Sequence, residues 1–194
     1  MILNYEEIIY IMDANTGYLS MDTPENLYKF LNNIDAEYRG SIVGFCYNDL
    51  KYPIVDKLEK IPAEAFYDCD LNFKWTAGPN LIQIDPEAFY RCKLDTVDLS
   101  AAKITELSDK TFIWSKIKNV ILPEGLKKIG MNTFSSSGIE EVYIPSTVES
   151  IGAESFYGCN NLKKVHLCKN SIEQGKLKIT PEDIARIKGK IVWF

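Results

Sequence analysis

The sequence predicts an α/β solenoid of about five coils, with a short parallel β-sheet and a cap at each end. A recurring motif is the first indication: the chain contains IPAEAFYDC at 61–69, IDPEAFYRC at 84–92 and IGAESFYGC at 151–159. Phenylalanines also recur every 22 or 23 residues, and a short apolar alternation follows most of them. One such unit cannot bury its own apolar face, so neighbouring units must stack to form a core.

Each repeat carries large apolar residues at fixed distances from one phenylalanine. The phenylalanines are Phe66, Phe89, Phe112, Phe134 and Phe156. Five residues earlier stand Ile61, Ile84, Leu107, Ile129 and Ile151, and eight earlier stand Leu58, Leu81, Ile104, Leu126 and Val148. The residue just before each phenylalanine is Ala, Thr or Ser. We therefore expect one short strand, a turn and one short helical or 3₁₀ turn per coil, with the phenylalanines piled along a shared core.

The strand of each coil is expected in the alternation that follows the phenylalanine. It reads LDTVDL at 94–99, IKNVIL at 117–122, IEEVYI at 139–144 and LKKVHL at 162–167. The Val-x-apolar end of each segment has the period of a strand with one buried face. Pro123 and Pro145 follow two of these strands, where they end the ladder without removing an internal hydrogen bond.

The coil that begins at Phe66 departs from this spacing. Strict spacing would turn Lys74 and Thr76 inward, whereas the apolar candidates are Phe73 and Trp75, one residue earlier. Either the strand slips by one residue, or the two aromatic side chains point outward. We favour the slip, because a buried lysine costs several kcal/mol unless it is paired.

The repeat resembles the BspA-like leucine-rich-repeat family. The resemblance covers roughly 52–168 and is clearest in LPEGLKKIGMNTFSSSGIEEVYIPSTVESIGAESFYGCNNLKKVHL, at 122–167. Repeat spacing, the Ile-Gly pairs at 129–130 and 151–152, the Ala/Ser-Phe pairs and the cysteines agree together. The resemblance implies a leucine-rich-repeat fold. Members of the family are typically longer arrays, are often exported, and include adhesins.

An open stack needs caps, because its ends expose core and strand edges. We divide the chain into an N-terminal α/β capping segment at 1–50, the solenoid at 51–169 and a C-terminal helix–strand cap at 170–194. In the first segment, 6–13 and 17–22 are predicted strands, 23–34 a helix and 41–47 a further strand.

The C-terminal cap has its own start and stop signals. Thr180 is expected to cap a helix that begins at Pro181 and directs Ile184 and Ile187 inward. The helix should end at Gly189, and KIVWF at 190–194 is expected to form a closing strand.

The distribution of charge and of apolar residues indicates which partners the protein binds and in which cellular compartment it is found. Acidic residues exceed basic ones by five in residues 1–60, and the rest of the chain is balanced. No basic stripe is present, which argues against nucleic acid binding. The apolar run IIYIM at 8–12 is too short to span a membrane, and it lacks the basic n-region and the small-residue cleavage site of a secretory signal. We expect a cytoplasmic protein, or an extracellular one if the chain is a piece of an exported protein.

The cysteines favour structure over metal binding. Cys69, Cys92 and Cys159 share one repeat position, which Ser115 and Ser137 fill in the other two coils. This exchange indicates a small, buried, weakly polar side chain and does not fit a structural metal site. A disulfide between the first two cysteines is geometrically possible. Cys46 and Cys168 have no metal-type spacing, so we expect no metal and no cofactor.

Three further features bear on catalysis or binding. His166 occupies a strand position that holds Asp, Ile or Tyr in other coils, so it reads as a variable exposed residue rather than a catalytic one. Tyr67, Tyr90 and Tyr157 follow their phenylalanines and are expected to cover the flank of the core. Trp114 should be at least partly exposed, and exposed tryptophan is enriched at binding hot spots.

Function is expected where the repeats vary. The outward strand residues should form two rows on the sheet, and Trp114 is a further candidate. The predicted binding residues are Thr96, Asp98, Asn119, Ile121, Glu141, Tyr143, Lys164, His166 and Trp114. The favoured hypothesis is a non-catalytic module that binds a protein or peptide through this face, as a monomer or with weak self-association.

Three alternatives remain open. The edge strand KIVWF suggests a structural protein that assembles end to end. An adhesin-like surface role follows from the family resemblance if the chain is exported. An enzyme with a site where the N-terminal segment meets the first coil is a less favoured hypothesis, and no catalytic residue is assigned.

Overall fold

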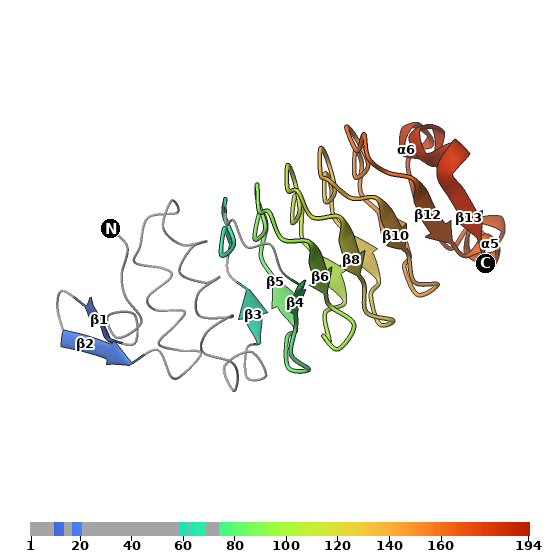
Figure 1. The fold of residues 1–194 in the computed structure, drawn as a ribbon. Coiled ribbons are helices and arrows are strands. Elements are labelled where there is room, and N and C mark those ends of the chain that lie inside the picture. Colours follow the sequence, from blue (N-terminus) through green and yellow to red (C-terminus); the bar gives the residue numbers. More distant parts are fainter. Residues whose placement is uncertain (1–9, 14–16, 21–58, 62, 69–73) are drawn as a thin grey trace.

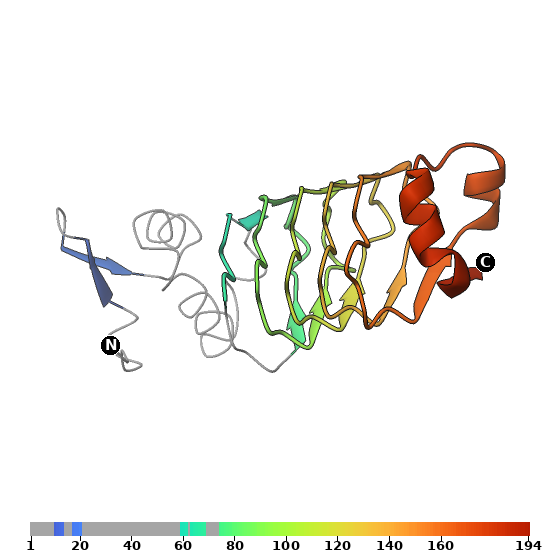
Figure 2. The same cartoon turned by 90° about the horizontal axis from the view of Figure 1, so that it is seen from above.

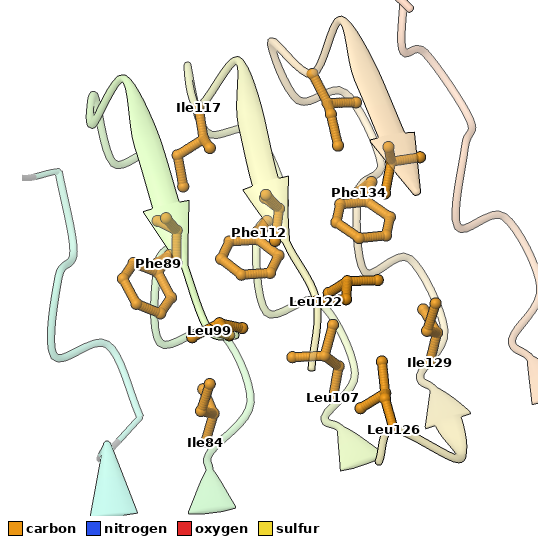
Figure 3. Close-up of a cluster of buried hydrophobic side chains, with 14 of the residues drawn as sticks. Ile84, Phe89, Leu99, Leu107, Phe112, Ile117, Leu122, Leu126, Ile129 and Phe134 are labelled. Atoms are coloured by element: carbon orange, nitrogen blue, oxygen red, sulfur yellow. The ribbon is translucent and has the colours of Figure 1, made fainter. Parts of the chain in front are cut away.

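The computed structural model describes residues 10–13, 17–20, 59–61, 63–68 and 74–194. Its central feature is the predicted ladder of phenylalanines (Figure 3). Successive rings from Phe66 to Phe156 have centroids 4.5 to 5.8 Å apart, and each ring is at most 3% exposed. Burying a side chain of this size contributes about 1.5–3 kcal/mol relative to leaving it in water. The ladder is therefore the main continuous element of the core.

The strands that follow the phenylalanines form one parallel sheet along the stack (Figure 1). Its order is β13-β12-β10-β8-β6-β4. The strands are β4 (Lys74–Thr76), β6 (Thr96–Asp98), β8 (Asn119–Ile121), β10 (Glu141–Tyr143), β12 (Lys164–Leu167) and β13 (Ile191–Trp193). Val97, Val120, Val142 and Val165 are all buried. The predicted strand positions are confirmed, together with the inward valine of each.

A second line of two-residue strands runs along another side of the stack (Figure 2). These strands are β3 (Lys60–Ile61), β5 (Gln83–Ile84), β7 (Glu106–Leu107), β9 (Lys128–Ile129) and β11 (Ser150–Ile151). β3 pairs with β5, and β7, β9 and β11 form a three-stranded parallel sheet. They contain the apolar residues that stand five positions before each phenylalanine, and all of these are buried.

The segment around each phenylalanine is a turn and not the helical or 3₁₀ turn that we expected. Two non-glycine residues per coil have positive φ in most coils, as at Glu87 (60°) and Arg91 (55°) around Phe89. Such residues cannot continue a right-handed helix. The turns are held by bonds of two kinds. Within the coil the N–H of Tyr90 donates to the C=O of Glu87 at 3.0 Å, and between coils the N–H of Phe89 donates to the C=O of Thr111 at 2.9 Å.

The small residue just before the phenylalanine stabilises the turn in three of the coils through a side-chain hydrogen bond. The hydroxyls of Thr111, Thr133 and Ser155 donate to the carbonyl oxygens three residues earlier at 2.7, 2.8 and 2.7 Å. The Cys/Ser position is buried in every described coil, at Cys92, Ser115, Ser137 and Cys159. The structural interpretation of that position is confirmed there, whereas Cys69 and its pairing lie outside the described residues.

The coil that begins at Phe66 slips, but in the direction opposite to the one expected. Trp75 pairs with Val97 and is 3% exposed, and Lys74 points to solvent. Trp75 therefore takes the first inward position and Ala77, also 3% exposed, takes the second. The strand of this coil therefore lies one residue later than the regular spacing, not one earlier, which keeps Lys74 out of the core. Phe73 lies outside the described residues.

The C-terminal segment 169–194 has the helix and strand that its sequence signals predict. Helix α5 (Lys169–Glu173) precedes α6 (Pro181–Ile187), whose N-cap Thr180 accepts a hydrogen bond from the N–H of Asp183. Ile187 is fully buried, whereas Ile184 is half-buried. A 3₁₀ turn, η1 (Lys188–Lys190), leads into β13, which pairs in parallel with β12. The predicted closing strand is confirmed.

Near the N-terminus, β1 (Tyr10–Asp13) and β2 (Gly17–Ser20) form an antiparallel pair, as the sequence predicts. The predicted helix at 23–34 and strand at 41–47 lie outside the described residues. No helix in the part of the chain that the structure describes is long and apolar enough to cross a membrane.

Candidate functional site

Strand register brings the predicted site residues into two rows on the exposed face of the β4–β13 sheet. The first row follows the pairs of Thr96 with Asn119, Asn119 with Glu141 and Glu141 with Lys164. In the second row, Asp98 pairs with Ile121 and Tyr143 with His166. Neighbouring residues within a row lie on adjacent strands, which are about 4.8 Å apart in a β-sheet.

The side chains in these two rows differ in how much of their surface is exposed to solvent. Ile121 and Tyr143 are 43% and 44% exposed, large fractions for an aliphatic and an aromatic side chain. Asn119, Glu141 and Lys164 are exposed as well, and Thr96 and His166 are half-buried. The middle of the face thus presents apolar side chains to solvent among polar ones.

We expected Asp98 to be exposed like the rest of its row, but this residue is buried and only 8% exposed. The ammonium of Lys74 lies 2.7 Å from its carboxylate, and the N–H of Ser100 donates to the same group at 3.0 Å. Burial alone would raise the pKa of Asp98, but these two hydrogen bonds outweigh it and lower the pKa. Asp98 is a structural residue covered by the strand before it, not part of the open surface.

The remaining charges on the face are paired between neighbouring coils. Lys118 contacts Asp95 at 2.9 Å and Lys163 contacts Glu140 at 2.6 Å. Glu141 lies 2.6 Å from the Nε2 of His166 and 3.5 Å from Lys164. The hydrogen bond with His166 lowers the pKa of Glu141, which keeps this carboxylate ionised. Since acid and base alternate along the stack, the face carries little unbalanced charge.

The closing strand adds apolar residues that the sequence reasoning missed. Val192 pairs with His166 and so continues the second row, and it is 37% exposed. The ring of Phe194, 46% exposed, stacks on Tyr143 with centroids 4.5 Å apart. We name Ile121, Tyr143, Val192 and Phe194 the apolar patch. The sequence predicts a strand at KIVWF, and extending the two rows into that strand identifies these residues.

Trp114 lies on a different side, among the turns. It is 54% exposed and has φ of 56°, a strained conformation for a bulky side chain. Its ring contacts Tyr90, which stacks on Tyr67 with centroids 5.3 Å apart. Both tyrosines are half-buried and cover the flank of the core as expected, whereas Tyr157 is 53% exposed and lies under the guanidinium of Arg186.

The described residues include acidic, histidine and cysteine side chains of the kinds that bind metals or take part in catalysis. Across the described ranges, no cluster of three or more His, Cys, Asp or Glu side chains is placed to hold a metal ion. Burial raises the pKa of Cys159, whereas a hydrogen bond with Ser171 lowers that of Cys168. The Nε2 of His166 contacts the carboxylate of Glu141 on the neighbouring strand. We assign none of these residues a catalytic role.

A surface depression of about 690 Å³ lies beside β9 and β11, away from the predicted site residues. It is lined by Asp109, Lys128, Met131, the two glycines Gly130 and Gly152, and the segment 177–180. The Asp109 carboxylate accepts the N–H of Met131 at 2.8 Å. The glycines are required by close coil packing, because a Cβ on Gly152 would lie 2.5 Å from the Met131 nitrogen.

Comparison with known proteins agrees with the repeat. The model of the family described as BspA type leucine rich repeat region matches residues 44–175 in six copies. A search of curated proteins found no match. Two similar solved structures are a leucine-rich cell surface protein from Faecalibacterium prausnitzii, 25% identical with a TM-score of 0.44, and a leucine-rich repeat protein from Bacteroides ovatus, 20% identical with a TM-score of 0.41. The matches cover 62% and 74% of this chain, but only 40% and 47% of the respective structures.

Proposed function

This chain belongs to the BspA-type leucine-rich-repeat family, and from this premise we propose that it is a non-catalytic module that binds a protein or peptide partner through the exposed face of the β4–β13 sheet. The observation that carries the proposal is the apolar patch. Three parallel strands and the segment that follows β13 present its side chains on one surface. Exposed aromatic and aliphatic groups surrounded by polar ones are the usual composition of a protein-binding surface.

The charges around the patch indicate how a partner would be recognised. Glu141, Lys163 and Lys164 already have partners of opposite charge on neighbouring strands. A partner that met these residues would gain little from new ion pairs, whereas burying Tyr143 and Phe194 would remove large apolar areas from water. We therefore expect a partner that inserts apolar or aromatic side chains and binds with weak dependence on salt.

The size of the patch bounds the size of the contact. From β8 to β13 there are three strand spacings, so the patch extends about 14 Å along the stack. An extended peptide of about four residues would cross it, at roughly 3.3 Å per residue. The first-row residues Asn119 and Lys164 lie beside the patch and would meet the polar groups of the same segment.

The proposal is tested by selecting binders from a displayed library of protein fragments from the source organism. Each selected fragment is then titrated against the wild-type chain and against the Ile121→Ser/Tyr143→Ser double variant. The matched control is Ile82→Ser/Met131→Ser, which removes two side chains that are 57% and 51% exposed but lie away from the patch. We expect at least a tenfold loss of affinity for the patch variant and no loss for the control.

Two results would contradict binding through the apolar patch. Equal affinity for wild type and the patch variant would remove the sheet face from the binding function. If Trp114→Ser then lost the binder, the site would lie on the turn side beside Tyr90; Ser is a suitable replacement because Ser136 occupies the equivalent position with φ of 53°. Affinity that fell more than tenfold between 0.05 and 0.5 M NaCl would contradict apolar recognition.

A further inference from the structure

The outer strand of the sheet, β13, has a backbone edge that no strand of the described chain covers. It stands at the end of the sheet order, with β12 as its neighbour. The N–H of Phe194 donates to the C=O of Leu167 at 3.2 Å, and the C=O of Phe194 accepts from the N–H of Lys169 at 3.1 Å. Because backbone groups alternate in direction along a strand, Ile191 and Trp193 direct theirs away from β12.

The side chains of β13 leave this edge open to pairing. Val192 and Trp193 are 37% and 48% exposed, and Ile191 packs partly against the core. Sheet edges are usually protected by a charged residue, a proline or a bulge, and β13 contains no charged residue and no proline. Two lysines, Lys188 and Lys190, precede the strand.

We propose that β13 pairs with β13 of a second copy of this chain, antiparallel, about a two-fold axis that passes between the Val192 residues of the two copies. In this register the N–H of Trp193 in each copy donates to the C=O of Ile191 in the other. The two Val192 side chains face each other across the axis on the exposed side of the sheet. The two six-stranded sheets become one continuous sheet, which removes the open edge from both copies.

The strand itself favours a second copy over another occupant. Its two outward residues are separated by one position, so antiparallel copies satisfy each other's backbone groups reciprocally. The same arrangement places Lys188 and Lys190 of the two copies at opposite ends of the pair, which avoids repulsion between them. Val192 meets Val192, an apolar cross-strand pair of the kind that stabilises sheets.

The contact is small, so the dimer should be weak. Two three-residue strands bury much less than the roughly 1,600 Å² of a standard stable interface. We expect a dissociation constant on the order of 100 µM, which corresponds to about 5–6 kcal/mol. Val192 belongs both to the apolar patch and to this contact, whereas Ile121 and Tyr143 lie on strands away from the edge. The Ile121→Ser/Tyr143→Ser variant should therefore lose the binder and keep the dimer, which distinguishes the two proposals.

Sedimentation of the full chain from 5 to 500 µM tests the pairing. Wild type should pass from monomer to dimer and no further. Trp193→Pro removes the outward N–H without removing a bond to β12, and should weaken the dimer at least tenfold. Ile82→Ser, an exposed apolar residue far from β13, should leave the dimer unchanged. Variants are compared only when their urea unfolding midpoints match that of wild type.

A charge exchange at the axis tests the register. Val192→Lys and Val192→Glu should each stay monomeric, because like charges then face each other, and their equal mixture should regain the dimer. A wild type that remains monomeric at 500 µM would overturn the proposal. So would a dimer that neither charge variant disrupts, a mixture that stays monomeric, or growth beyond the dimer.

Discussion

The ring of Phe194 stacks on the ring of Tyr143, with centroids 4.5 Å apart and planes inclined by 23°. Tyr143 belongs to β10 and Phe194 follows β13, so the contact passes over β12 and connects the closing segment to the repeats. The two residues also form the largest part of the apolar patch. The same contact therefore contributes to stability and shapes the proposed binding surface.

A double-mutant cycle measures this contact. Tyr143→Ala, Phe194→Ala and the double variant should give a coupling free energy of about 0.5–1.5 kcal/mol in urea unfolding, as expected for a stacked aromatic pair. Ile121→Ala with Phe194→Ala serves as the reference pair, because no ring contact joins those residues. A coupling free energy for Tyr143 and Phe194 no larger than that of the reference pair would contradict the stacking seen here.

The phenylalanine ladder should dominate the stability of the coils. Phe112→Ala replaces a fully buried ring with contacts to Phe89 and Phe134, and we expect a loss of about 3–5 kcal/mol in the free energy of unfolding. Trp114→Ser, two residues away and more than half exposed, should change it by less than about 1 kcal/mol. Equal effects in chemical denaturation would mean that the ladder is not the core.

Close packing between coils makes one glycine far more sensitive than another. A Cβ at Gly152 would lie 2.5 Å from the Met131 nitrogen and 2.6 Å from the Gly130 carbonyl carbon, so the backbone must shift. We expect Gly152→Ala to cost about 1–3 kcal/mol. Gly125 has no atom within 4 Å of its Cβ position, and Gly125→Ala should be neutral or slightly stabilising. Thermal unfolding of the two variants side by side checks the difference.

Asp98 should make stability depend on pH on the acid side. Its hydrogen bonds with Lys74 and Ser100 lower its folded pKa below the ordinary value of 3.8. The stabilisation is therefore complete above that value and is lost as the pH falls through the folded pKa. The difference in unfolding free energy between wild type and Asp98→Asn should shrink as the pH falls from 6 to 3.

The exposed ion pair between Lys118 and Asp95 is the control for the half-covered pair of Lys74 and Asp98, because salt should screen the exposed pair more strongly. Lys118 lowers the pKa of Asp95 through a hydrogen bond, but that pair is solvent-exposed and should be screened by salt. At 1 M NaCl the effect of Asp95→Asn should be lost, whereas that of Asp98→Asn should persist. A pH-independent cost of Asp98→Asn would exclude the ionised pair as its source.

The sequence predicted the repeat because its signal is distributed over many residues. Each coil supplies a phenylalanine, two large apolar residues and a strand valine at fixed spacing, so one irregular residue does not hide the period. The Cys/Ser position was readable for the same reason, since Ser115 and Ser137 fill it beside Cys92 and Cys159. These features depend only on which face of a coil is buried.

Features that depend on one local geometry were harder to predict. The direction of the slip at Trp75 depends on an extra residue before the strand, which spacing alone cannot locate. We expected Asp98 to be exposed because its row faces outward, but the side chain of Lys74 on the neighbouring strand β4 reaches the Asp98 carboxylate and covers it. The turns around each phenylalanine adopt positive φ at ordinary residues such as Glu87, which carries no glycine or asparagine signal.

The most direct test of the sheet face as a binding site is an NMR titration of a selected binder, observed through labelled isoleucine methyl groups. Ile121 reports on the apolar patch, Ile113 on the turn beside Trp114, and Ile82 on an exposed surface away from both. The account predicts that the Ile121 methyl signal shifts with the binder while those of Ile113 and Ile82 stay in place. A shift at Ile113 or Ile82 with Ile121 unmoved would contradict it.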